Sequence, residues 1–142
     1  MILKTCLLTN NDCYKKNVKM KNKVPVGIVV HSTAVNNPFI KRYVQPSKND
    51  PNYKTIINDI GTNANNNDWN RPNVKKCVHA FIGYNIKGKI ETYQTLPFDT
   101  CCWGCGSGTK GSYNNNPTAY LQFEICESEL TDREYFNSVI QE

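Results

Sequence analysis

The apolar residues of this chain gather in short blocks whose periodicity predicts β-strands. Residues 26–31 (VGIVVH) are almost continuously apolar and β-branched, which is typical of a strand buried on both faces. Residues 77–84 and 90–95 flank the polar segment NIKGK and predict the two arms of a β-hairpin. Residues 119–126 alternate between apolar side chains and Gln, Glu or Cys, which predicts one more strand. A β-sheet is therefore expected at the centre of the fold.

Two segments carry helix signals. Asn37, followed by a proline, is expected to cap a helix over residues 38–45, where apolar side chains recur at helical spacing. Near the end of the chain, Thr131 and Glu134 form the capping-box pattern that opens an amphipathic segment. The pattern therefore predicts one helix after the first strand and one helix at the end.

The remaining segments lack a regular period. Residues 1–23 predict a short strand or arm followed by a loop, and residues 47–75, rich in Asn, Asp and Pro, predict a long surface loop. Loops of this length in a compact domain are usually functional or mobile. Strands separated by helices and long loops predict one α/β domain over residues 1–142, with a mixed central β-sheet and flanking helices.

Composition narrows the class of protein. A chain of 142 residues, 39% of them hydrophobic, is long enough for one domain with a packed core. The net charge of +5 favours anionic partners, but the lysines are scattered and no nucleic-acid-binding motif occurs, so nucleic acid is not an expected partner. No apolar run reaches the roughly 18 residues of a membrane-spanning helix. The first apolar run is also too short for a secretory signal, so we expect synthesis in the cytoplasm.

The chain has seven cysteines, an odd number that leaves at least one thiol unpaired in a monomer. Without a signal for export, reduced thiols are the expected state. Cys102 and Cys105 form a single C-x-x-C, whereas a structural zinc site normally has a second pair of ligands. The cysteines are therefore either buried thiols or ligands of a metal, and the sequence leaves both open.

His31 ends the first strand block and is followed by Ser32 and Thr33. One interpretation is a strand end before a capped helix. The other is an imidazole that a rigid strand holds in a fixed direction for a metal ion.

Four segments in this order resemble a single protein family: GIVVHSTAVNNPFIKRYVQP, NNNDWNRPNVKKCVHAFIG, GKIETYQTLPFDTCCWGCG and LQFEICESELTDREYFN. They are similar to zinc-dependent N-acetylmuramoyl-L-alanine amidases of type 2, especially the lysins of Gram-positive phages and prophages. The resemblance covers nearly all of the chain after residue 4. It implies the fold of peptidoglycan recognition proteins, in which a mixed sheet flanked by helices bears a cleft with one zinc ion.

The resemblance also implies a reaction and its residues. The reaction is hydrolysis of the amide between the lactyl group of N-acetylmuramic acid and L-Ala in bacterial peptidoglycan, at the cell wall. His31 matches the first zinc ligand, Glu124 matches the carboxylate that helps activate water, and His79 is the nearest match to a residue beside the metal. Such an amide is unreactive, so polarisation of its carbonyl and a proton acceptor for water suit this chemistry.

The match to the family is incomplete. The usual W-H-A-G or W-H-C-G reads Trp103-Gly104-Cys105-Gly106 here, and the family's later zinc ligands lie beyond the position of Glu142. We therefore expect an amidase-like domain that lacks its C-terminal part. The alternatives are a degenerate domain that binds peptidoglycan or another partner without cleaving it, and a metal site completed by cysteines.

Two tryptophans are candidates for substrate binding. Trp69 and Trp103 lie in segments rich in Asn or Gly. Their rings either stack on a sugar or pack beneath the loops that carry them.

Overall fold

A computed structural model describes residues 3–109, 111–114, 119–129 and 131–142. Five strands form one sheet in the order β1-β4-β3-β7-β2. Their bounds are Leu3–Thr5 (β1), Ile28–Ser32 (β2), Ala80–Tyr84 (β3), Ile90–Gln94 (β4) and Leu121–Ile125 (β7). Strands β3 and β4 are antiparallel, and the other three neighbouring pairs are parallel. The predicted α/β class with a mixed sheet is thus confirmed, and so is the hairpin.

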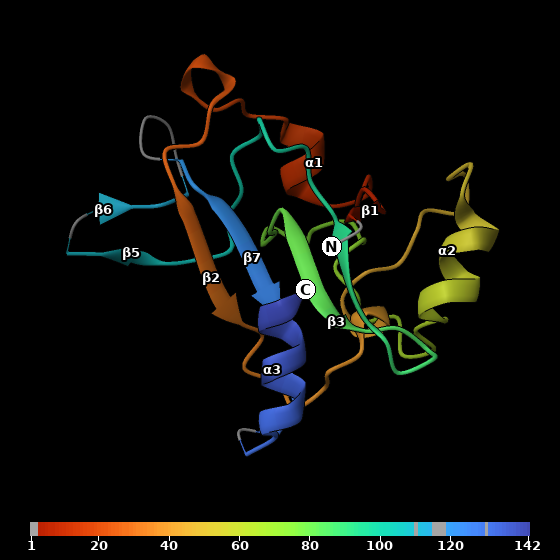
Figure 1. The fold of residues 1–142 in the computed structure, drawn as a ribbon. Coiled ribbons are helices and arrows are strands. Elements are labelled where there is room, and N and C mark those ends of the chain that lie inside the picture. Colours follow the sequence, from red (N-terminus) through yellow and green to blue (C-terminus); the bar gives the residue numbers. More distant parts are fainter. Residues whose placement is uncertain (1–2, 110, 115–118, 130) are drawn as a thin grey trace.

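Short helices surround this sheet (Figure 1). They are α1 (Asp12–Lys16), α2 (Tyr53–Ile60) and α3 (Arg133–Gln141), with 3₁₀ turns η1 (Lys21–Lys23) and η2 (Ile40–Arg42). A two-stranded ribbon pairs β5 (Ser107–Gly108) with β6 (Gly111–Ser112). No helix in the described part of the chain has the length and apolar character needed to cross a bilayer.

The main hydrophobic core lies on one face of the sheet. Phe81 of β3 and Tyr93 of β4 are register partners, so their side chains share this face. Helix α2 and the segment around η2 supply the opposing apolar residues, including Ile40, Ile56 and Ile60, all of which are buried. This face is therefore the one on which helices and loops cover the strands.

Strand β2 corrects one prediction. The strand forms close to where it was predicted, at the edge of the sheet, but only one of its faces is covered. Val26, Ile28 and Val30 are 56–61% exposed, whereas Val29 and His31 alternate with them on the more covered face. A continuous apolar run cannot distinguish a central strand from an edge strand whose outer face is uncovered.

Strand β7 has its polar side chains inside. Gln122, Glu124 and Cys126 are at most 5% exposed, whereas Leu121, Phe123 and Ile125 are only partly buried. Gln122 is held by distant partners, since its Oε1 accepts from the amide of Gly104 (3.1 Å) and its Nε2 donates to Asn114 (2.9 Å). The strand over residues 119–126 is thus confirmed, with its hydrophilic positions facing the core.

The helix predicted over residues 38–45 is wrong. Only the 3₁₀ turn η2 forms there, because the chain stays extended at Phe39, which makes a parallel bridge to Tyr84 of β3. Asn37 does use its side-chain oxygen, but it accepts from the amide of Phe39 (3.2 Å) in a tight turn rather than at a helix start.

The long loop predicted over residues 47–75 contains helix α2, and the loop after β1 contains the short helix α1. Ile56 and Ile60 of α2 are buried in the core. Asp59 anchors the helix to the sheet, because its carboxylate pairs with Lys4 of β1 (2.6 Å) and accepts from the hydroxyl of Tyr93 (2.5 Å). These long-range contacts stabilise a helix that the Asn-rich composition around it conceals.

The cap of α3 also differs from the prediction. Asp132, not Thr131, is the N-cap, and its Oδ1 accepts from the amide of Tyr135 (3.0 Å). We expect Asp132→Ala to lower the free energy of unfolding by about 1 kcal/mol, the usual cost of an N-cap. Thr131→Ala is the matched control and should change it by less than about 0.5 kcal/mol, a typical surface value. Urea unfolding of the two variants checks this; equal effects would show that Thr131 contributes to the cap.

Candidate functional site

His31 and Glu124 meet on adjacent strands. They are register partners in the parallel pair β2–β7, so their side chains leave the sheet on the same face. The Nδ1 atom of His31 lies 3.1 Å from Oε2 of Glu124. The structure thus brings together the two residues that the sequence placed on neighbouring strands of one cleft.

Both side chains are left with an unused buried polar atom. The contact between Nδ1 and Oε2 is short enough for an ion pair with a protonated ring, but it lacks the alignment of a hydrogen bond. Within the described residues, Nε2 of His31 and Oε2 of Glu124 are buried without a hydrogen-bond partner. Such atoms are costly unless something else satisfies them, such as water, an ion or a substrate group. His31 and Glu124 are therefore the candidate site in the described part of the chain.

A second set of polar groups borders the pair. The hydroxyl of Tyr43 donates to Oγ1 of Thr33 (2.9 Å), which also accepts from the amide of Glu127 (3.0 Å). Burial raises the pKa of Tyr43, and the negative charge of nearby Glu124 adds to this rise. Tyr43 is therefore a protonated hydroxyl beside the carboxylate. The sequence analysis missed it because its spacing was assigned to a helix.

Trp69 supports the site from within the core. Its ring meets the rings of Phe81 (5.0 Å between centroids) and Tyr43 (6.3 Å) edge-on, and Lys76 Nζ lies 4.7 Å from its centre. Only 7% of Trp69 is exposed. In this arrangement Trp69 packs beneath its loop, which matches the second of the two interpretations of this residue.

His79 lies on the same face, alongside Gln122, two residues or about 7 Å along β7 from Glu124. Its Nδ1 accepts from the amide of Gln122 (3.0 Å), and its Nε2 donates to the carbonyl of Thr100 (2.8 Å). Burial lowers the pKa of His79 to about 4. The ring is therefore neutral, and both nitrogens join elements of the fold, so we assign it no step in the chemistry proposed below.

Trp103 is partly buried against two small clusters near the start of β7, one of which contains three cysteines. These are Cys13, Cys77 and Cys102, and Cys102 Sγ lies 3.4 Å from Nδ1 of His79. None of the seven cysteines, all of which the structure describes, is part of a disulfide. Burial raises the pKa of Cys77, and that of Cys126 beside Glu124, so these thiols are protonated.

The donor atoms do not fit the zinc site that the resemblance implies. Such a site normally has three protein ligands, and the pair supplies two groups, His31 and Glu124. Among the residues that the structure describes, no group of three or more His, Cys, Asp or Glu side chains is arranged to hold a metal ion. Cys102 contacts His79 rather than His31, and Cys105 contacts Asn114, so neither completes the site.

Comparison of this chain with family models, with curated proteins and with solved structures gives no match. The assignment of function therefore depends on the geometry of the pair and on the resemblance of the four sequence segments.

Proposed function

We propose that this protein is an amidase-type domain that binds bacterial peptidoglycan at the face carrying His31 and Glu124 and acts on the lactyl–L-Ala amide. The observation that carries the proposal is the His31–Glu124 pair itself: Nδ1 of His31 lies 3.1 Å from Oε2 of Glu124, and within the described residues neither Nε2 of His31 nor Oε2 of Glu124 has a hydrogen-bond partner. The fold of the amidases and peptidoglycan recognition proteins is part of the same proposal, and the mixed sheet is consistent with it.

The two side chains suit amide hydrolysis in complementary ways. The carboxylate of Glu124 is placed to accept a proton from a water molecule and to return it to the leaving amine of L-Ala. The free ring nitrogen of His31 is placed to hydrogen-bond to that water or to the scissile carbonyl. Because the donor set does not fit a three-ligand zinc site, no step is assigned to a metal ion, and we expect zinc to bind weakly and hydrolysis to be slow.

A second candidate is a domain that binds peptidoglycan without cleaving it. The small donor set favours it, since only two groups converge where the family has three metal ligands. In this case the same atoms would satisfy a polar group of the bound peptide or sugar.

One experiment tests both candidates. Purified cell walls are incubated with the wild-type chain, His31→Ala or Glu124→Gln, and co-sedimented protein and newly released amino groups are measured. We expect binding by the wild type, weaker binding by His31→Ala, and any amine release to fall about 100-fold or more in Glu124→Gln, the usual contribution of a general base.

Ser32→Ala is the matched control, because Ser32 neighbours His31 but bonds to Glu127 (2.7 Å), and it should leave both readouts unchanged. Binding without amine release would assign the non-cleaving function. Failure of the folded wild type to bind cell walls would refute both candidates.

A further inference from the structure

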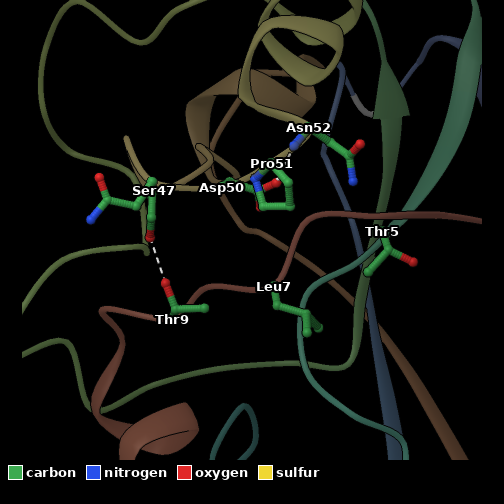
Figure 2. A pocket seen from close by; sticks show the side chains of 8 residues that line it. Thr5, Leu7, Thr9, Ser47, Asp50, Pro51 and Asn52 are labelled. Carbon is green, nitrogen blue, oxygen red and sulfur yellow. Dashed lines mark hydrogen bonds between the residues drawn. The ribbon is translucent and has the colours of Figure 1, made fainter.

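A pocket of about 350 Å³ lies at the other edge of the sheet, between the segment from β1 to α1 and the segment before α2. Figure 2 shows Thr9 and Ser47 on one side of it, Thr5 on the other, and Leu7 and Pro51 between them. Asn49, Asp50 and Asn52 complete the lining. The volume falls in the usual range for small-molecule sites.

This pocket is separate from the His31–Glu124 pair. Strands β1 and β2 are the two edges of the five-stranded sheet, and four strand spacings of about 4.8 Å separate them by roughly 19 Å. In Figure 1, β2 and α2 accordingly lie on opposite sides of the molecule. A ligand in the pocket therefore does not touch the proposed reactive pair.

One wall of the pocket is held rigid. The hydroxyl of Ser47 contacts that of Thr9 and accepts from the side-chain amide of Asn70 (3.1 Å). Asn70 is only 7% exposed, and its Oδ1 in turn accepts from the backbone amide of Asn10 (2.8 Å). The position of Ser47 is thus set by a partly buried hydrogen-bond network before any ligand arrives, which lowers the entropic cost of binding.

Other residues of the lining offer unused hydrogen-bonding groups. Oδ1 of Asp50 accepts from the amide of Asn52 (2.8 Å), but its Oδ2 has no hydrogen bond from the residues that the structure describes. The side chain of Asn52 makes no capping bond to α2. Within the same part of the chain, no hydrogen bond occupies the hydroxyl of Thr5. The pocket therefore presents acceptors and donors together.

This chemistry selects the ligand class. Asp50 is the one charged residue of the lining and disfavours anions, while hydroxyls and amides disfavour a wholly apolar ligand. A sugar hydroxyl both donates and accepts, and so matches a carboxylate, a hydroxyl and an amide. Leu7 and Pro51 supply an apolar surface for C–H groups or a methyl group. We propose that the pocket binds an uncharged sugar residue that carries an acetamido group, independently of His31 and Glu124.

The test is titration of the ¹⁵N-labelled chain with triacetylchitotriose, followed by NMR. We expect saturable shifts at the amides of Thr5, Leu7, Thr9 and residues 49–52. Asp50→Asn keeps an oxygen for the turn at Asn52 but removes the charge, and should weaken binding about tenfold, as expected for loss of one hydrogen bond to a charged group. Thr5→Val, which removes an exposed hydroxyl, should also weaken it.

Ser32→Ala, at an exposed position on β2 that does not line the pocket, is the control and should bind the trisaccharide as the wild type does. Absence of saturable binding, or binding that neither pocket variant weakens while both remain folded, would overturn the proposal. Shifts centred on β2 and β7 and lost in His31→Ala would overturn it too, while leaving the function proposed for His31 and Glu124 in place.

Discussion

Gly83→Ala is expected to destabilise the protein by about 2 kcal/mol, because inserting a methyl group into a packed core typically costs 1–3 kcal/mol. A Cβ at this position would lie 2.6 Å from the carbonyl oxygen of Pro38 and 2.7 Å from Cβ of Cys126. The carbonyl of Pro38 accepts from the amide of Tyr84 (2.7 Å), so it cannot retreat without weakening that bond. Alanine also reduces the entropy of the unfolded chain, but that gain of about 0.4–1 kcal/mol is smaller than the clash.

Gly106→Ala is the matched control for this variant. No atom outside its chain neighbours lies within 4 Å of a Cβ built on Gly106. We expect its free energy of unfolding to stay within about 0.5 kcal/mol of the wild type. Urea unfolding curves measure both variants. If Gly83→Ala proves as stable as Gly106→Ala, the close approach of Pro38 and Cys126 to β3 is wrong.

The second large effect is acid destabilisation through His79. Its pKa falls from 6.5 in the unfolded chain to about 4 in the fold, mainly through burial. Since the folded value is the lower one, its stabilisation is complete above pH 6.5 and is lost as the pH falls from 6.5 to 4. The difference corresponds to about 3 kcal/mol between pH 7 and pH 4. The lowered pKa of Asp59, about 2, acts only below this window.

The measurement is the free energy of unfolding in urea at several pH values between 7 and 4, with the His79 ring followed by NMR. His79→Gln is expected to be less stable at pH 7 and to lose most of the slope in this window. Thr131→Ala, which removes no titratable group, is the control and should keep the slope. An unchanged slope in His79→Gln would show that folding does not lower the pKa of His79.

The strands could be predicted because alternation of apolar and polar residues and turn sequences are local features of the chain. Alternation and the NIKGK turn locate β3, β4 and β7 within a few residues, and they also place His31 and Glu124 at strand positions that prove to be paired. The local pattern could not predict which face of β7 packs against the core. Gln122 and Glu124 are buried because their partners come from β2, the segment before β3 and distant loops.

The structure of residues 38–45 and of helix α2, too, could not be predicted from local sequence alone. Residues 38–45 have helical spacing, yet the bridge between Phe39 and Tyr84 draws them into an extended path. Helix α2 forms within an Asn-rich segment because Ile56 and Ile60 meet the core and Asp59 meets Lys4. Tertiary contacts override local preference in both cases. The pocket near α2 had no local signal for the same reason, since its walls come from two segments about 40 residues apart.

Because His31 lies on an edge strand, its contact with Glu124 can be lost without unfolding of the whole domain. Strand β2 joins the sheet through β7 alone, and its outer face is uncovered. Fraying of such a strand costs less free energy than global unfolding, because the core on β3 and β4 stays intact. Heat or mild denaturant should therefore separate His31 from Glu124 while most of the molecule is still native, so that the function proposed for the pair is lost before the fold melts.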